Sequence, residues 1–301
     1  MTATRVARSC HPSPVTRHLS AFTLIELLVV IAILGILAGL AVPALKNLGK
    51  SEGNVSAARQ LLDDVGRARQ LALANRTTAV YMVFVPPNFW NNLNYNNSAT
   101  YNNWWNNLSA QQQSAATNMC DQQLAGYTFM AKGAIGDQPG NHQWHYLAPW
   151  QTLPEGTFIA TNKFSYPGTV ISSSSQPLYS AWNQDYPHSD QNTVYAFTNM
   201  VSVPFPTADS TNYISMPCIA FNYRGQLIFD LQHPENPSTR DEYIPLAHGS
   251  VADAADGNKV LYFAPPVVKE IPPGNSTNLA YNLVHIDALT GRAVLEYHKL
   301  P

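Results

Sequence analysis

The chain is poor in charge and in cysteine, and each shortage argues against a class of function. Only 12% of the 301 residues are charged, and the formal net charge is −2. Proteins that bind nucleic acid neutralise phosphates with a surplus of lysine and arginine, so this balance predicts no nucleic-acid partner. The three cysteines, Cys10, Cys120 and Cys218, form no CxxC pair. A zinc ribbon or a thioredoxin-like redox site is therefore not expected.

Catalytic motifs are also lacking. The sequence contains no GxSxG, no P-loop, no GxGxxG and no HExxH. His142 with His145, and a DxxHxD cluster at 185–190, have spacings too common in polar chains to predict a metal site. Four carboxylates would make a hydrolytic pair only if the fold brought two of them together: Asp230, Glu235, Asp241 and Glu242. We expect a protein that is not an enzyme and that needs no cofactor or metal.

What the sequence does have is one long apolar run near its N-terminus. Residues 1–21 carry three arginines and no acid, and residues 22–45 are apolar or small except for Thr23 and Glu26. As a helix, that run would measure about 36 Å at 1.5 Å per residue, enough to cross a bilayer core. The basic residues before the run place the N-terminus in the cytoplasm and the rest of the chain outside.

Glu26 is the anomaly of this run. A secretory signal peptide has a shorter apolar stretch, and a plain membrane anchor gives no reason for an acid. An unpaired carboxylate facing lipid costs about 2.5–3.5 kcal/mol, so a partner is expected. Cleavage between Ala21 and Phe22 would create an α-amine one helical turn from Glu26, positively charged at neutral pH. Glu26 could then pair with its own amine or with that of a neighbouring subunit, and so set the axial register of an assembly.

The motif AFTLIE at 21–26, followed by about twenty apolar residues and Pro43, resembles the N-terminus of type IV prepilins and type II secretion pseudopilins. The resemblance implies that prepilin peptidase cuts after Ala21 and N-methylates Phe22. It also implies that the apolar helices form a filament core, that Glu26 guides subunit docking and that Pro43 kinks the helix. The family usually has glycine before the cut, where this chain has the equally small Ala21.

The residues after Pro43 predict an amphipathic helix to about Asn75. Gly49 and Gly53 suggest a flexible or partly melted joint before it. Apolar residues then recur every three or four positions, which predicts a stripe laid against a sheet. These residues are Val55, Ala58, Leu62, Val65, Ala68 and Ala72.

Short runs rich in β-branched and aromatic residues predict strands separated by Pro and Gly turns. They are 79–85, 156–160, 193–203, 219–222 with 226–230, 259–264, and 283–287 with 293–298. Two of the hairpins, at 219–229 and 284–297, resemble those of H-type minor pseudopilins and their fimbrial relatives. In these hairpins Gly225 and Gly291 are expected to supply the positive φ of a tight turn.

Ten of the twenty residues at 88–107 are asparagine, interleaved with aromatic residues. Aromatic side chains among amides could stack on sugars or line a protein interface. They could equally be a surface loop packed on the domain beneath it. If Cys10 leaves with a leader, Cys120 and Cys218 remain as a pair that could form one disulfide in an oxidising compartment.

Together these features predict an α+β, pilin-like protein. Its segments are a cleaved basic leader (1–21), a transmembrane or filament-core helix (22–45), an amphipathic helix (46–76) and a mostly antiparallel β-rich globular domain (77–301) with an insertion at about 86–150. The predicted function is that of a structural, minor subunit of a type II secretion pseudopilus or type IV pilus. The alternative is a membrane-anchored binding module that recognises polysaccharide or protein through the insertion.

The resemblance also implies partners and a location. The partners are prepilin peptidase, other pilin or pseudopilin subunits, an inner-membrane assembly platform and membrane lipid. The chain would cross the inner membrane once, with its N-terminus in the cytoplasm and its globular domain in the periplasm, before it joins the pilus or pseudopilus.

Overall fold

A computed structural model of the chain describes residues 24–75, 79–87, 106–133, 137, 143–172, 193–257, 259–260, 264–277 and 282–297, and within the first range it describes side chains over 24–35 and 55–75. Ala21, Phe22, the Asn-rich stretch at 88–105 and the DxxHxD cluster lie outside the described residues. The chain divides into two compact units, Met1–Gly49 and Lys50–Pro301. Each unit is described by itself.

One helix, α1 (Leu24–Asn75), contains most of both helical segments predicted from the sequence. It ends at Asn75, as predicted. The helix continues through Gly49 and Gly53, so the chain is not melted there, and the flexible joint stays a prediction. An interior glycine costs about 1 kcal/mol relative to alanine, which a helix of this length tolerates. Pro43 also lies inside α1, and the kink assigned to it stays a prediction.

The second half of α1 packs on a sheet through small side chains. The fully buried positions of the stripe are Ala57, Ala58, Leu61, Val65, Ala68 and Ala72. Four of the six are alanine, so the helix backbone can approach the sheet closely. The observed stripe differs slightly from the predicted one: Val55 is 49% exposed and Leu62 is only partly buried, whereas Ala57 and Leu61 are fully buried.

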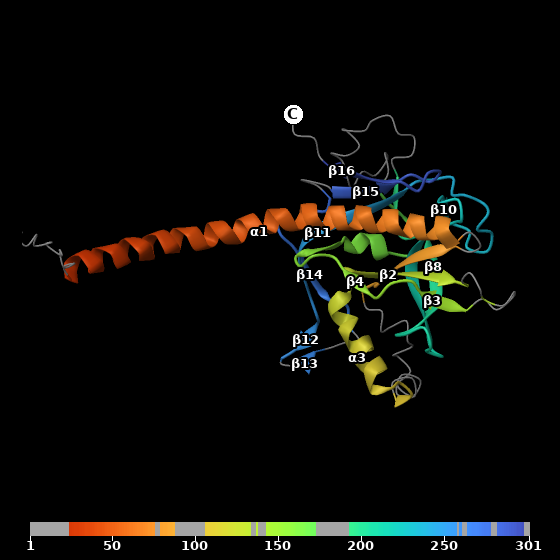
Figure 1. Cartoon of the computed structure of the whole chain (residues 1–301), viewed down its shortest axis with the longest axis horizontal. Coiled ribbons are helices and arrows are strands. Elements are labelled where there is room, and N and C mark those ends of the chain that lie inside the picture. The colour runs from red at the N-terminus through yellow and green to blue at the C-terminus, as the bar shows by residue number, and fades with distance from the viewer. Residues whose placement is uncertain are drawn as a thin grey trace, which may run out of the picture. The chain divides into compact units, whose positions relative to one another are not determined.

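The sheet beneath α1 has seven strands, all paired antiparallel. Its main path runs β10-β9-β1-β2-β3, with β8 added to β9 and β4 added to β2. The strands are β1 (Val80–Phe84), β2 (Gly126–Lys132), β3 (Trp144–Tyr146), β4 (Gln151–Thr152), β8 (Asn199–Pro204), β9 (Tyr213–Phe221) and β10 (Leu227–Ile228). Figure 1 shows the second half of α1 lying across these strands.

A second antiparallel sheet follows the order β14-β11-β15-β16, with β5 also paired to β11. Its strands are β5 (Thr157–Ile159), β11 (Glu242–Ala252), β14 (Val267–Glu270), β15 (Asn282–Ile286) and β16 (Ala293–Tyr297). One apolar cluster joins the two sheets to α1, since it contains Phe84 of β1, Leu61 of the helix and Ile286 of β15.

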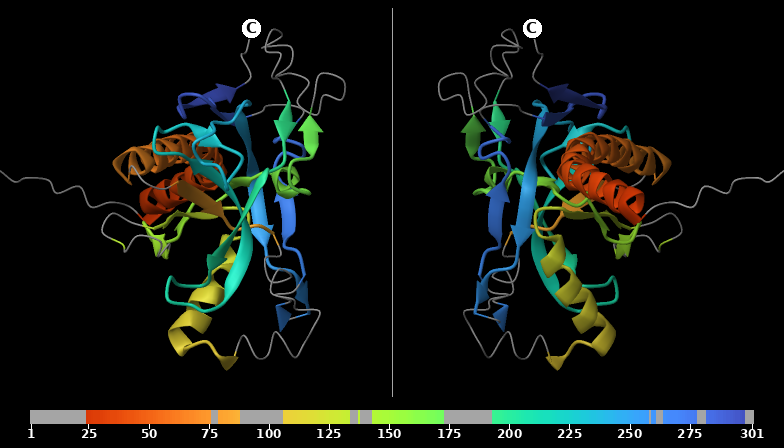
Figure 2. Two further views of the ribbon diagram at one scale, coloured as in Figure 1. Left: turned by 90° about the vertical axis from the view of Figure 1, so that its right-hand side faces the viewer. Right: turned by 90° about the vertical axis from the view of Figure 1, so that its left-hand side faces the viewer.

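Short elements complete the fold. Two-stranded pairs are formed by β6 (Val170–Ser172) with β7 (Val194–Tyr195) and by β12 (Ala255–Asp256) with β13 (Lys259–Val260). The helical elements are α3 (Ala110–Asn118), η2 (Cys120–Gln122) and η3 (Thr161–Phe164). Helix α3 begins with a capping box between Ser109 and Gln112, and it lies at the same end of the domain as β12 and β13 (Figure 2).

The α+β class and the mostly antiparallel pairing are confirmed, but two long strands were not predicted. Strand β2 lies between β1 and β3 in the main sheet, although its sequence falls in the stretch expected to be an insertion. Six of its seven residues are buried, because α1 covers one face and a second apolar cluster covers the other. It therefore shows no alternation of polar and apolar residues. Strand β11 was missed because it contains Pro245 and Gly249, which usually interrupt strands.

The two hairpin turns that carried the finer resemblance meet at the second half of α1. Gly225 has φ +75° and Gly291 has φ +61°, which confirms the positive φ expected at both. A Cβ on Gly291 would lie 2.0 Å from the carbonyl oxygen of Gly225, so only glycine fits there. Arg69 of the helix donates from Nε to the carbonyl oxygen of Thr290 at 2.6 Å. The helix therefore holds the last hairpin directly.

Candidate functional site

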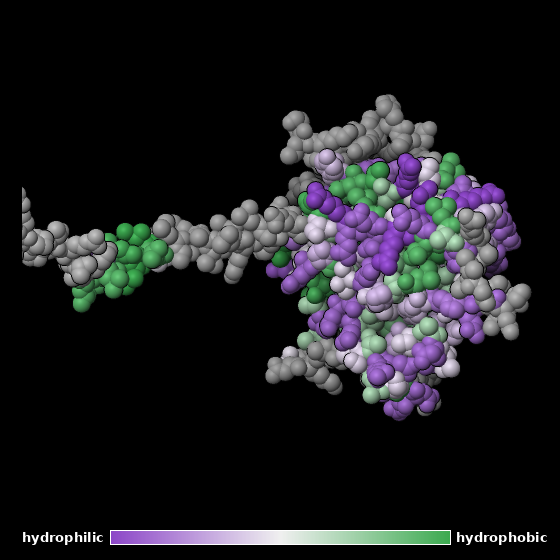
Figure 3. Space-filling model, viewed as in Figure 1, coloured by the Kyte–Doolittle hydropathy of each residue, from purple (hydrophilic) through white to green (hydrophobic). Residues whose placement is uncertain are grey.

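The first described turns of α1 expose apolar side chains on every side. Nine large apolar residues at 24–34 are 46% to 82% exposed, and Figure 3 shows this stretch as a continuous apolar surface. Since consecutive helical positions differ by about 100°, the exposed residues surround the helix and leave it without a polar face. Exposed apolar surface of this extent marks a contact with membrane or with protein.

Over the parts of the chain that the structure describes, no helix combines the length and the apolar character needed to cross a membrane.

Glu26 is the one charged residue among the described residues at 24–35, and its side chain is exposed. It lies in the first turn of α1, where backbone N–H groups lack partners within the helix and carry partial positive charge. A carboxylate is electrostatically favoured at this position. The predicted pairing with the Phe22 amine stays a prediction, because Phe22 lies outside the described residues.

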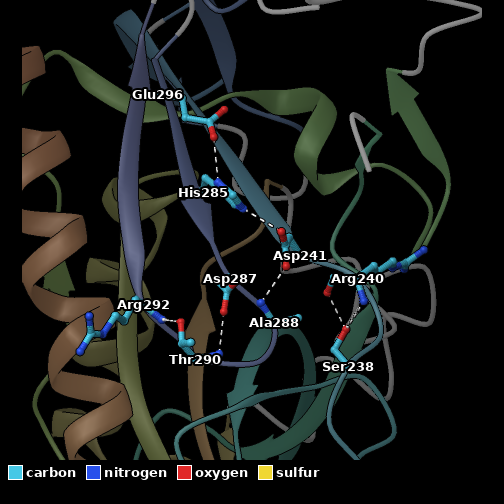
Figure 4. A network of polar contacts seen from close by, with 9 residues as sticks. All are labelled: Ser238, Arg240, Asp241, His285, Asp287, Ala288, Thr290, Arg292 and Glu296. Atoms are coloured by element: carbon cyan, nitrogen blue, oxygen red, sulfur yellow. Dashed lines mark hydrogen bonds and ion pairs between the residues drawn. The ribbon is translucent and has the colours of Figure 1, made fainter. Parts of the chain in front are cut away.

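A second group of polar residues surrounds His285 of β15 (Figure 4). Its Nδ1 lies 2.8 Å from Oε1 of Glu296, and its Nε2 lies 2.9 Å from Oδ2 of Asp241. The ring of Tyr243 stacks on the imidazole with 4.5 Å between centroids. The other oxygen of Asp241 accepts the backbone N–H of Ala288 at 2.7 Å. These contacts join the β15–β16 hairpin to the segment that leads into β11.

The two carboxylates favour the charged form of His285. Burial alone lowers the pKa of His285, but the hydrogen bonds to Glu296 and Asp241, together with their negative charges, raise it above its ordinary value. Both ring nitrogens can donate at once only in the imidazolium form. In that form His285 has no lone pair for a metal or for base catalysis, and its contacts hold these segments together.

The last turn, between β15 and β16, has its own hydrogen bonds. Oδ1 of Asp287 accepts the backbone N–H of Thr290 at 2.6 Å, and Gly291 N–H donates to the Asp287 carbonyl oxygen at 2.8 Å. The side-chain bond with Thr290 lowers the pKa of the Asp287 carboxyl. Because Thr290 also accepts from Arg69, this turn is fixed both internally and against α1.

Three of the four carboxylates considered for hydrolysis have a described side-chain partner. Asp241 contacts His285, and Glu242 is buried against Lys163. Asp230 contacts the exposed His233 at 2.7 Å. Three of the four thus contact three different nitrogen-bearing side chains. Among the described residues there is also no group of three His, Cys, Asp or Glu that could hold a metal ion.

Cys120 and Cys218 are both buried in the second apolar cluster, where they are present as thiols. Burial raises the pKa of the Cys218 thiol, with a smaller contribution from the nearby Glu242. A thiol with a raised pKa forms little thiolate at neutral pH and is a poor nucleophile. The two are not bonded to each other in this structure, and a disulfide between them in an oxidising compartment stays a prediction.

Comparison with known proteins addresses the N-terminal segment. Residues 17–42 match the model of the prokaryotic N-terminal methylation motif. This stretch is the signature of type IV prepilins and pseudopilins. It includes the predicted cleavage residues Ala21 and Phe22 and the acid Glu26. No curated protein and no solved structure matches the chain. The prepilin signature therefore rests on this segment, and the H-type minor subclass stays a prediction.

Sequence reasoning found the N-terminal motif and both glycine turns but missed the polar contacts of the globular unit. His285 and Asp241 are 44 positions apart, and Lys163 and Glu242 are 79 apart. No local pattern relates residues so far apart in the chain. Lys163 gave no signal at all, since a single lysine in a polar loop looks like a solvated residue.

Proposed function

We propose that the chain is a structural, minor subunit of a type II secretion pseudopilus or a type IV pilus. Prepilin peptidase would cut it after Ala21 and methylate Phe22. One observation supports this most strongly: a helix within the prepilin signature exposes apolar side chains all round and carries a single acid in its first turn. Such a helix needs an apolar environment outside its own chain.

Physical chemistry suggests how that environment changes during assembly. The helix would first reside in the inner membrane and then enter a bundle of similar helices on the assembly platform. Lipid tails are about as apolar as leucine, so burial of apolar area alone does not drive helices together in a membrane. Close packing and a polar pair must supply the preference. The pairing of Glu26 with the Phe22 amine of a neighbour would provide that pair and fix the axial step.

The globular unit would remain on the extracytoplasmic side and be displayed on the filament. Its described contacts support a stable domain, since the second half of α1 is held by the sheet and by the last hairpin. Gln60 and Asp64 of the helix both hydrogen-bond the hydroxyl of Tyr127 on β2. The sheet is thus joined to the second half of α1 through packed side chains.

The proposal is tested by replacing Glu26. In cells that assemble filaments, the Glu26→Ala protein should be cut normally but absent from the sheared filament fraction, as judged by immunoblotting. Asp63→Ala is the matched control, because Asp63 is an exposed acid on the same helix, within the globular unit. Incorporation of Glu26→Ala at the wild-type level would overturn the structural role.

The alternative, a membrane-anchored binding module, makes a different prediction. If the Asn-rich stretch is the functional part, replacing Trp104 and Trp105 together should remove the cellular phenotype while filaments still contain the protein. Loss of the phenotype with Glu26→Ala alone favours the structural role.

A further inference from the structure

A lysine and a glutamate are buried in direct contact inside the globular unit. Lys163 of η3 is 0% exposed, Glu242 at the start of β11 is 4% exposed, and the Nζ atom contacts Oε1 of the glutamate. These are among the residue types least often buried completely. A buried ion pair loses much of its attraction to desolvation, so it is weak evidence for stability by itself.

The surroundings of this pair are aromatic and fixed in place. Lys163 Nζ donates to the carbonyl oxygen of Tyr195 at 2.7 Å and lies 4.9 Å from the centroid of the Phe197 ring. The guanidinium of Arg240 stacks on the Tyr195 ring at 3.7 Å. Water is therefore excluded from the amine, while one permanent cation stays close to the pair.

This environment favours the uncharged forms of both groups. Burial lowers the pKa of Lys163 and raises the pKa of Glu242, and in each case this effect outweighs the attraction between them. A neutral amine has the lone pair that makes lysine a nucleophile. A neutral carboxylic acid is a better electrophile than a carboxylate. Both pKa shifts are thus toward the protonation states from which an amide can form.

We propose that Lys163 and Glu242 are joined by an intramolecular isopeptide bond. Nζ attacks Cδ of the protonated carboxyl group, and the Cδ–OH bond then breaks. One proton from Nζ leaves with that hydroxyl as water, so nothing is oxidised or reduced and no co-reactant is needed. Arg240 and the backbone N–H of Tyr243 are placed to stabilise the negative charge that develops on the carboxyl oxygen.

The fold holds the two residues together before any bond forms. Ala160 N–H donates to the carbonyl oxygen of Pro245 at 2.9 Å, and Phe197 N–H donates to that of Lys163 at 2.9 Å. Reacting groups held in contact gain the rate advantage of an intramolecular reaction. The bond would close a loop across 79 positions and restrict the unfolded chain as a disulfide does. Unlike a disulfide, the isopeptide bond requires no oxidising compartment. Its formation does not depend on the proposed assembly function.

Mass spectrometry of the folded full-length chain tests the bond. Trypsin cuts after lysine and arginine, so a linked chain should give one branched peptide in which 133–224 is joined to 241–259 and Lys163 is not cleaved. That peptide should be one water lighter than the sum of its parts and should be the main form recovered. Separate peptides ending at Lys163 and at Lys259, with no linked form, would overturn the proposal.

A matched variant tests whether the missing water comes from this pair or from another part of the chain. Lys163→Arg places a guanidinium opposite Glu242, and a guanidinium is not a nucleophile at neutral pH. Its intact mass should equal the sequence mass, whereas the wild type should be one water lighter. Persistence of the water loss in Lys163→Arg would contradict the assignment to this pair. If the variant does not fold, the wild-type peptide digest still decides the question.

Discussion

Along residues 24–34 of α1, large apolar side chains face outward on all sides, whereas in the unit formed by residues 50–301 several charged side chains face inward. Lys163, Glu242 and His285 each lie against an oppositely charged or polar group of the same unit. In the globular unit, the partner that makes burial tolerable is supplied by the chain itself. The first turns of α1 do not cover their own apolar side chains, so that surface must be covered by membrane or by other protein.

This difference separates assembly from folding. Substitutions at 24–34 should affect where the protein goes and what it joins but leave the unfolding of the globular unit unchanged. Substitutions of buried residues within 50–301 should destabilise the globular unit but leave unchanged what the N-terminal helix joins. Each of the following substitutions tests one side of this contrast.

The largest stability effect is expected at the main sheet. Phe84 is fully buried and stacks on Phe197 with 4.8 Å between ring centroids. Phe84→Ala should lower the free energy of unfolding by about 3–5 kcal/mol, because it removes buried contacts and leaves a cavity. Ile31→Ala is the control, since Ile31 is 60% exposed. Denaturant unfolding in detergent should show a change below about 0.5 kcal/mol for it. Equal changes in both variants would contradict the separation.

The contact between the two hairpin turns predicts the next effect. Gly291→Ala puts a residue with a Cβ at a left-handed backbone position, and that Cβ would collide with the carbonyl oxygen of Gly225. We expect the free energy of unfolding to fall by about 2–4 kcal/mol. Gly168→Ala is the matched control, because Gly168 has φ +73° but only an ordinary contact at 3.9 Å. It should cost about 1–2 kcal/mol. Thermal unfolding of both proteins would show whether close approach adds to backbone strain.

The smallest effect is expected at His285, and it should depend on pH. His285→Gln removes a charged donor from Glu296 and Asp241, which we expect to cost about 1–2 kcal/mol near pH 6. Because the pKa of His285 is raised on folding, its stabilisation is complete below about pH 6.5, the ordinary value for histidine, and is lost as the pH rises through the folded value. Wild type and variant should therefore converge in alkaline denaturation experiments.

His233 is the control for that experiment. It also contacts a carboxylate, that of Asp230, but its side chain is 58% exposed. Solvent screens such a pair, so His233→Gln should change stability little at any pH. If wild type and His285→Gln differ in stability by the same amount at every pH, the imidazolium is not the form that these contacts stabilise.

The sequence predicted best those features that depend on local rules. Asn75 as the end of the helix and the glycines at 225 and 291 follow from helix periodicity and from turn geometry. The methylation motif is likewise a contiguous pattern, and the match at 17–42 confirms its identification. Burial of Ala58, Val65 and Ala68 on the sheet follows from their spacing.

Features that depend on distant segments were not predicted. Strand β2 is covered on both faces and shows no alternation, and β11 includes a proline whose carbonyl oxygen still accepts a bond from Ala160. The contacts of Lys163 with Glu242 and of His285 with Asp241 arise only when the second sheet forms. Their charge states are properties of the folded domain, so no sequence pattern could reveal them.

We infer that the N-terminal helix is completed by processing and by partners outside its own chain. Mass spectrometry of the mature N-terminus, from cells that contain prepilin peptidase, tests it most directly. We expect a chain that begins with N-methylated Phe22, so that a charged amine lies one turn from Glu26. A chain that retains Met1, or one that is cut after Leu40, would contradict it.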